Sequence, residues 1–235
     1  MIFKLALVFF LGYFESKHIT FDSEVMITEK SPEMRLFSPE GERLYLTAQE
    51  RKRFLRALDE EERENRIFCL VLHYTGCRPS EALELTPNGI LVDSKDIVFR
   101  SLKKRKRDSK GRVKQPEYRT VPVPSHLIDV FDFVFDIRKV HRRKEGLKKP
   151  FWSMSRPTAY RLVKRVMNRA KIKGKQATGK GLRHGFGIAM LTGPKPLPIH
   201  ILSQLMGHST TKTTEIYLQV VSEEKRKLVL DAWED

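Results

Sequence analysis

The stretch LMGHSTTKTTEIY, residues 205–217, places a histidine, His208, nine residues before a tyrosine, Tyr217. Two earlier blocks each contribute an arginine, Arg78 in TGCRPSE and Arg183 in GLRHGF. Two guanidinium groups can hold a phosphate through bidentate hydrogen bonds, a histidine beside them can donate to it, and a tyrosine can attack it. Together, the four residues indicate a site where a phenolic oxygen attacks a phosphodiester bond.

At these blocks the chain resembles the tyrosine recombinases, or phage-type integrases, over residues 44–221. The resemblance implies a site-specific recombinase that cleaves and rejoins DNA strands through a 3′-phosphotyrosine intermediate. Tyr217 would be the nucleophile, and neither a metal nor another cofactor is implied. Two alternatives stay open: a non-catalytic or fragmentary DNA-binding relative, and a relaxase similar to type IB topoisomerases.

Arg78 follows a glycine that is expected to end a helix, and Glu81 lies one helical turn later. Taken alone, the two could form a surface ion pair at i,i+3 spacing with little consequence. With Arg183 and His208 present, we interpret Arg78 as part of a phosphate clamp, because only arginine offers a planar bidentate fork. The positive field of such a clamp would lower the pKa of Tyr217 from its ordinary value of about 10.

A strongly basic run, KKRKR, begins at Lys103, between two expected strands. The resemblance places the catalytic lysine here, at Lys103 or at the neighbouring Lys104, as the general acid for the departing 5′ oxygen. The other basic side chains of this connection are expected to bind the DNA backbone. These DNA-binding candidates are Lys104, Arg105, Lys106, Arg107, Lys110, Arg112 and Lys114.

Lys180 departs from the resembled pattern, which usually has a histidine three residues before the second arginine. In the family that residue helps to handle the tyrosine proton. A lysine with a pKa of about 10.4 is protonated at neutral pH and is a poor base, although it can donate a hydrogen bond to a phosphate oxygen. We keep Lys180 among the expected catalytic residues. His184, next to Arg183, is expected to pack or cap rather than react.

Composition favours a polyanionic partner. The chain has 45 Lys and Arg against 29 Asp and Glu, a formal net charge of +16 and a pI near 9.9. Such an excess favours nucleic acid through phosphate contacts, and double-stranded DNA is the expected partner. The two cysteines, Cys69 and Cys77, lack the spacing of a metal site and are expected to be reduced and half-buried in a cytoplasmic, DNA-associated protein.

We expect three regions: an apolar segment and linker at 1–43, a catalytic domain at 44–221 and a helical tail at 222–235. The apolar start is shorter than the ~20 residues of a membrane-spanning helix, so no membrane anchor is expected. It could be a buried or partner-contacting segment, or the remnant of a larger N-terminal domain. The tail could pack on its own domain or dock on a neighbouring subunit, and the resemblance implies a homotetramer on two DNA sites.

The expected fold is mainly α with a small β-hairpin, an α+β arrangement that matches the catalytic domain of the resembled family. Thr47 and Glu50 form a capping box before a first helix, and a second helix ends at Thr75–Gly76. Two β-type runs, 97–101 and 119–123, are expected to pair as a hairpin with a long basic tip. Further helices are expected at residues 127–139, 158–170, 182–191 and 198–206, with a short turn around Tyr217.

Overall fold

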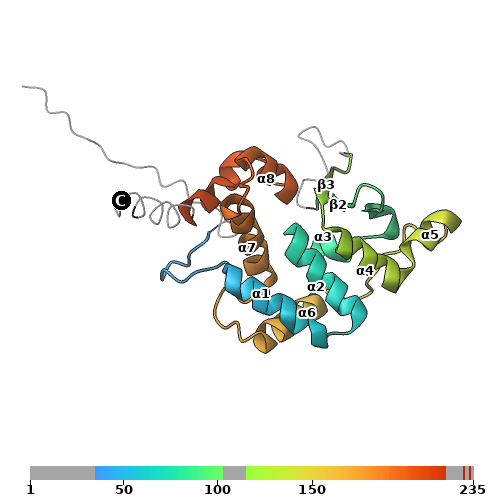
Figure 1. Ribbon diagram of the computed structural model, residues 1–235, viewed down its shortest axis with the longest axis horizontal. Helices are drawn as coiled ribbons and strands as arrows, with labels where there is room; N and C mark the ends of the chain where they lie inside the picture. The colour runs from blue at the N-terminus through green and yellow to red at the C-terminus, as the bar shows by residue number, and fades with distance from the viewer. Residues whose placement is uncertain (1–34, 103–114, 221–229, 231–232, 234–235) are drawn as a thin grey trace, which may run out of the picture. The chain divides into compact units, whose positions relative to one another are not determined.

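The computed structural model of the 235-residue chain describes residues 35–102 and 115–220, together with positions 230 and 233. Its helices, shown in Figure 1, are α1 (Ala48–Ala57), α2 (Arg63–Thr75), α3 (Pro79–Leu83), α4 (Ser125–Phe135), α5 (Ile137–Arg143), α6 (Arg156–Arg169), α7 (Gly179–Thr192) and α8 (Ile199–Met206). The short 3-10 helices are η2 (Leu58–Glu60), η3 (Pro87–Gly89), η4 (Thr211–Thr213) and η5 (Glu215–Tyr217). The expected fold class, mainly helical with a small sheet, is confirmed.

The sheet has three antiparallel strands in the order β1 (Ile90–Leu91), β2 (Asp96–Arg100) and β3 (Tyr118–Pro122). The expected hairpin is confirmed as β2 and β3, whose register pairs Phe99 with Arg119. The sequence did not predict β1, because two residues are too few to show an alternating pattern. The hairpin connection, with Lys103 and the basic residues up to Lys114, lies outside the described residues.

Local capping explains where the first helices begin and end. The predicted capping box at α1 is present: the Thr47 side chain accepts from the backbone N–H of Glu50, and the Glu50 side chain accepts from that of Thr47. Helix α2 ends at Gly76, which has a left-handed φ of 58°. A side chain there would be strained and would also collide with the Phe186 ring, since a Cβ would lie 2.4 Å from it.

Helix α7 lies between two hydrophobic clusters. The larger cluster gathers residues of α1, α2, α4, α6 and the sheet, and α7 contributes Leu182 to it. The smaller cluster includes Phe186 of α7 with Leu202 of α8 and Tyr217 of η5. Leu36, which precedes the expected domain start at residue 44, is also buried in the smaller cluster. Because α7 is fixed from both sides, its residues between Leu182 and Phe186 are held in a rigid environment.

One predicted helix is interrupted. We expected a continuous helix over residues 127–139, but α4 ends at Phe135 and α5 begins at Ile137. Asp136 between them has a left-handed backbone with φ 52° and ψ 41°. The carboxylate of Asp132 accepts the backbone N–H of Arg138 at 2.8 Å and therefore caps the first turn of α5. This side-chain cap competes with a continuous helical backbone.

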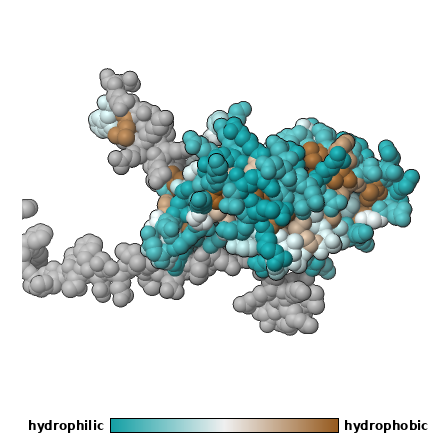
Figure 2. Space-filling view, turned by 90° about the horizontal axis from the view of Figure 1, so that it is seen from below, coloured by the Kyte–Doolittle hydropathy of each residue, from teal (hydrophilic) through white to brown (hydrophobic). Residues whose placement is uncertain are grey.

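The surface seen in Figure 2 is largely hydrophilic, with apolar residues gathered toward the side on which Figure 1 places α4 and α5. Among the described residues no helix combines the length and the hydropathy that a membrane crossing requires. The apolar start and nearly all of the C-terminal tail lie outside the described residues, so their predicted roles stay predictions. Both cysteines are free and fully buried rather than half-buried.

Candidate active site

Arg78 lies at the corner between α2 and α3, where it forms the N-cap of α3. Its Nη1 donates to Glu81 Oε1 at 3.0 Å, and its backbone N–H donates to Glu81 Oε2 at 2.9 Å. The ion pair at i,i+3 spacing is therefore present, but it is not confined to the surface. The carboxylate side chain is fully buried, whereas the guanidinium side chain of Arg78 is 21% exposed. The buried carboxylate of Glu81 thus holds the guanidinium of Arg78, which still reaches solvent.

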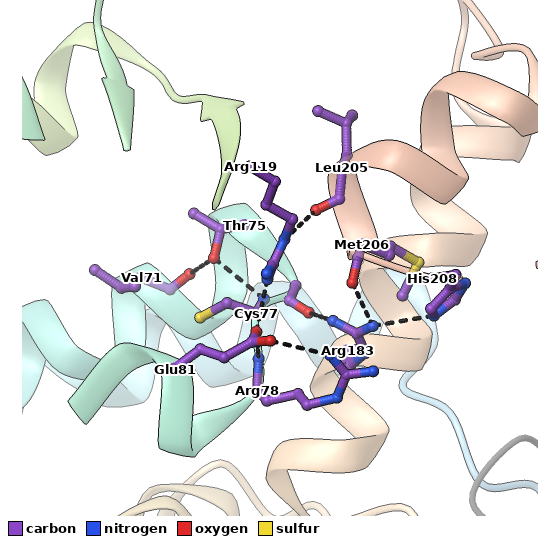
Figure 3. A network of polar contacts seen from close by, with 11 residues as sticks. Val71, Thr75, Cys77, Arg78, Glu81, Arg119, Arg183, Leu205, Met206 and His208 are labelled. Atoms are coloured by element: carbon purple, nitrogen blue, oxygen red, sulfur yellow. Dashed lines mark hydrogen bonds and ion pairs between the residues drawn. The ribbon is translucent and has the colours of Figure 1, made fainter. Parts of the chain in front are cut away.

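Arg183 lies in the second turn of α7 and is buried. Figure 3 shows its side chain pointing toward Met206 and His208. Its Nη1 donates to the carbonyl of Gly76 at 2.6 Å, and its Nη2 donates to the carbonyl of Met206 at 2.7 Å. Burial, and then the charge of Arg78, lowers the pKa of Arg183 to about 10. The guanidinium is therefore still charged at neutral pH, and it ties the end of α2 to the end of α8.

His208 follows Gly207, whose left-handed φ of 65° ends α8. Its Nε2 lies 3.0 Å from Nη2 of Arg183, and its Nδ1 lies 2.8 Å from the hydroxyl of Thr214. A guanidinium can only donate, so Nε2 is the acceptor and the ring proton resides on Nδ1. Burial, followed by the charge of Arg183, lowers the pKa of His208 to about 3, so the imidazole is neutral.

Tyr217 is completely buried in η5, and its hydroxyl lies 3.1 Å from Nδ1 of His184. The ring packs on Gly187 of α7, where an added Cβ would lie 2.6 Å from Cζ of the tyrosine. Burial raises the pKa of Tyr217 to about 12, although the charges of Arg183 and Arg78 oppose the shift. The charges of the clamp therefore act in the predicted direction, but in the conformation described desolvation outweighs the positive field.

His184 is buried, as expected of a packing residue, and it also holds the Tyr217 hydroxyl. The sequence reasoning did not predict that contact. The adjacent Lys180 is exposed in the first turn of α7, and its charge contributes to lowering the pKa of His184 after the larger effect of burial. Lys103 and the other basic candidates between it and Lys114 lie outside the described residues.

Arg119 of β3 is a further residue of this network that we did not predict. Its Nη2 donates to Glu81 Oε2 at 2.6 Å and its Nε donates to the carbonyl of Leu205 at 2.9 Å, as drawn in Figure 3. The strand pattern offered a signal, because Arg119, Val121 and Val123 alternate and the two valines are buried. An arginine on the inward face of a strand requires a buried partner.

The described residues thus bring three arginines, one buried carboxylate and a neutral histidine together at the junction of α2, α7, α8 and β3. Three guanidinium charges exceed one carboxylate charge, so the junction carries a net positive charge suited to an anion. Among the described residues, no group of three or more His, Cys, Asp or Glu could hold a metal ion. The arrangement can bind a phosphate through arginine side chains.

A model described as the phage integrase family matches residues 44–224. The chain therefore belongs to the phage integrase family, as the resemblance of its three motifs predicted. Its relatives include the tyrosine recombinase XerA of Pyrococcus furiosus, 27% identical over 193 residues, which cover 78% of this chain and 60% of the relative. Another is the tyrosine recombinase XerC of Caldanaerobacter subterraneus, 28% identical over 216 residues, which cover 86% of this chain and 56% of the relative.

Solved structures show the same fold. The crystal structure of XerA recombinase has a TM-score of 0.60 and 22% identity, with 80% of this chain and 64% of that chain covered. The catalytic domain of bacteriophage HP1 integrase has a TM-score of 0.51 and 22% identity, with 76% of this chain and 88% of that chain covered. The expected catalytic-domain fold is therefore confirmed. This chain spans about 60% of the length of the curated relatives it matches.

Proposed function

We propose that this chain carries the catalytic machinery of a site-specific DNA recombinase of the tyrosine type. The observation that carries the proposal is the direct contact of Arg183 with both the end of α2, beside Arg78, and His208. Arg183 and the Gly76 carbonyl that it binds are 107 positions apart in the chain, yet they meet at one positively charged junction. The proposed partner is double-stranded DNA, with four copies assembling on two DNA sites.

In the proposed reaction, the phosphodiester binds first to Arg78, whose side chain reaches solvent. Arg183 supports the same phosphate from the buried side. His208 Nε2 accepts a hydrogen bond as described, so it must gain a proton before it can donate to a phosphate oxygen. The negative charge of the phosphodiester favours that protonation, because it raises the pKa of a nearby imidazole.

Tyr217 then attacks phosphorus through its phenolic oxygen. A bond forms between that oxygen and phosphorus while the phenolic proton passes to water. The bond from phosphorus to the 5′ oxygen breaks, and the products are a 3′-phosphotyrosine and a free 5′ hydroxyl. Lys103, or Lys104 beside it, is proposed to give the 5′ oxygen its proton, and Lys180 to donate a hydrogen bond to the phosphate. Attack by the 5′ hydroxyl of a partner strand reverses the step, so the bond energy is conserved.

The reaction requires Tyr217 to leave its position on His184. Its hydroxyl is buried and protonated, and its pKa is about 12. This observation also favours the second candidate function, a DNA-binding relative that does not cut. In that case the hydrogen bond between His184 and Tyr217 would be purely structural.

A suicide-substrate assay decides between the two. Wild-type protein, Tyr217→Phe and Arg78→Ala are incubated with nicked duplexes from the DNA that flanks the gene and with nicked duplexes of random sequence. Denaturing gels then reveal any covalent protein–DNA adduct. We expect an adduct with the wild type and none with Tyr217→Phe, since only the phenolic oxygen is removed. Arg78→Ala should lower the adduct rate at least a hundredfold, because one arm of the clamp is missing.

Tyr160→Phe is the matched control, because it removes the hydroxyl of an exposed tyrosine on α6. It should form the adduct as the wild type does. An adduct that persists in Tyr217→Phe would exclude the assigned nucleophile. Binding without any adduct supports the non-cutting relative, and an adduct on every sequence with relaxation of supercoiled plasmid supports a topoisomerase-like relaxase.

A further inference from the structure

Arg119 connects parts of the site that no other described side chain joins directly. It projects from β3 and bonds both to Glu81 of α3 and to the main chain of Leu205 in the last turn of α8. Its side chain is only 8% exposed. Its guanidinium carbon lies 5.1 Å from the centre of the Phe99 ring, so an aromatic face supports it from the sheet side.

On one side, Arg119 acts on Arg78 through Glu81. The two carboxylate oxygens divide their hydrogen bonds: Oε1 accepts from Arg78 Nη1, and Oε2 accepts from Arg78 N and from Arg119 Nη2. Burial alone would raise the pKa of Glu81. The hydrogen bond and charge of Arg119, followed by the weaker contributions of Arg78, outweigh burial, and the pKa of Glu81 is lowered. Arg119 thus keeps the carboxylate ionised, and an ionised carboxylate is what holds the Arg78 guanidinium.

On the other side, Arg119 acts on the end of α8. The carbonyl of Leu205 accepts from Arg119 Nε, and the next carbonyl, that of Met206, accepts from Arg183 Nη2. Gly207 packs directly on Arg119, since an added Cβ would lie 3.1 Å from Nη1. His208 follows at once. Arg119 and Arg183 therefore hold consecutive carbonyls immediately before His208.

One nitrogen of Arg119, Nη1, is buried without a hydrogen bond among the described residues. Leaving a buried guanidinium N–H unpaired is unfavourable, because the group no longer has water around it. Neutralising Glu81 requires only a positive charge, whereas Arg119 uses two separate nitrogens, Nη2 for Glu81 and Nε for the Leu205 carbonyl. The fork is needed because Arg119 reaches Glu81 and the Leu205 carbonyl at the same time.

We infer that Arg119 is a positioning residue of the proposed phosphate site. It fixes the position of Arg78, at the N-cap of α3, relative to that of His208, which follows α8. The inference rests on the proposed function of the site. Arg119 itself does not touch the phosphate in this role. It acts through Glu81 on one side and through the Leu205 carbonyl on the other.

Two substitutions separate the two roles of the side chain. Arg119→Lys keeps a positive charge for Glu81 but lacks the two separate nitrogens with which Arg119 bonds Glu81 and the Leu205 carbonyl. Arg119→Gln removes the charge as well. The matched control is Arg169→Gln, which removes one of two arginines from Glu61, a carboxylate that is also nearly buried and is remote from the site. Thermal unfolding of each variant reports whether it is folded.

The kinetic test measures single-turnover adduct formation at saturating nicked duplex, together with the Kd for the same duplex. We expect both Arg119 variants to lower the adduct rate at least tenfold with Kd within threefold of the wild type, because misplaced groups affect the chemical step. In Arg119→Gln the acid limb of the pH–rate profile should also move to higher pH, because Glu81 then protonates more readily. Arg119→Lys should leave that limb in place. Arg169→Gln should change neither the adduct rate nor the acid limb.

A second measurement does not depend on catalysis. NMR of the Glu81 carboxyl carbon and of the Arg78 Nε–H, in protein labelled at glutamate and arginine, should show a raised carboxyl pKa and a more mobile guanidinium in Arg119→Gln. Wild-type rate and pH profile in folded Arg119 variants would overturn the inference while the proposed function stands. Absence of any adduct from the wild type would overturn the proposed function, and the NMR titration would then still decide the role of Arg119. If Arg119→Gln does not fold, the adduct rate of Arg119→Lys decides it.

Discussion

The hydrogen bond between His184 and Tyr217 joins two buried groups of unusual acidity. Burial, then the charges of Lys180 and Arg183, lowers the pKa of His184 to about 3. Its second ring nitrogen, Nε2, is also buried and has no hydrogen-bond partner among the described residues. The folded protein therefore holds a neutral imidazole, and a proton taken up there would have no acceptor at Nε2.

This pKa shift predicts acid sensitivity of the fold. In the unfolded chain His184 takes up a proton near its ordinary pKa of about 6.5, whereas the folded protein does so only near pH 3. The contribution of His184 to the free energy of unfolding is therefore fully present above about pH 6.5 and is lost as the pH falls from there toward 3. In His184→Gln, which keeps a polar partner for Tyr217, the free energy of unfolding should decline less steeply, by up to about 1.4 kcal/mol per pH unit.

Urea unfolding of both proteins between pH 4 and 7 measures this difference, with His126→Gln as the control that removes an exposed imidazole. Parallel loss of stability in the wild type and His184→Gln would contradict the assignment of a buried, neutral His184.

At the scale of elements, the junction of α4 and α5 depends on a left-handed residue that is not glycine. Asp136 has φ 52°, a conformation that costs residues with a Cβ about 1–2 kcal/mol and glycine much less. The Asp132 carboxylate holds the start of α5 by bonding both the backbone and the guanidinium of Arg138. The junction is thus a capped break rather than a bent helix.

Paired substitutions test this geometry. At position 136, Asp136→Gly should be more stable than Asp136→Ala by about 1 kcal/mol, because only glycine adopts the left-handed region without strain. At Asp129, an exposed position inside α4, the order should reverse by a similar amount, because alanine favours a right-handed helix. Chemical denaturation of the four variants gives the two differences, and the same order at both positions would mean that α4 and α5 form one helix in solution.

Local signals explain what the sequence predicted about the elements. The Thr47 capping box, the helix end at Gly76 and the hairpin strands depend on neighbours within a few residues or on a simple alternation, and all three are confirmed. The contact between Glu81 and Arg78 is equally local. By contrast, Arg119 meets partners 38 and 86 positions away, and His184 meets Tyr217 across 33 positions. Such contacts arise when β3 packs against α3 and α8, and α7 against η5, which no local pattern specifies.

At the scale of the whole molecule, the formal net charge of +16 predicts strongly salt-dependent binding to DNA. Neutralised phosphates release counterions, so the logarithm of affinity should fall linearly with the logarithm of salt concentration, by about 0.9 per neutralised phosphate. Replacing Lys110, Arg112 and Lys114 with alanine should reduce that slope by roughly one for each phosphate that is no longer neutralised. Titrations of a fluorescent duplex between about 50 and 200 mM salt measure it.

Lys175→Ala is the control for this titration, because Lys175 already forms ion pairs with Glu40 and Glu42. Its slope should equal that of the wild type. An unchanged slope in the triple variant would mean that the basic connection between the hairpin strands does not bind the DNA backbone.

The packing of the Tyr217 ring on Gly187 has a consequence for the proposed DNA cleavage. A protein with an accessible, ionised tyrosine beside clamped phosphate would break any duplex that it met. Here the ring fills the space left by a missing side chain, and its hydroxyl is both covered and protonated. Each 1.4 kcal/mol needed to expose it makes spontaneous exposure about tenfold rarer. If the chain cleaves DNA as proposed, packing against a glycine on a neighbouring helix would therefore suppress accidental nicking before any target sequence is recognised.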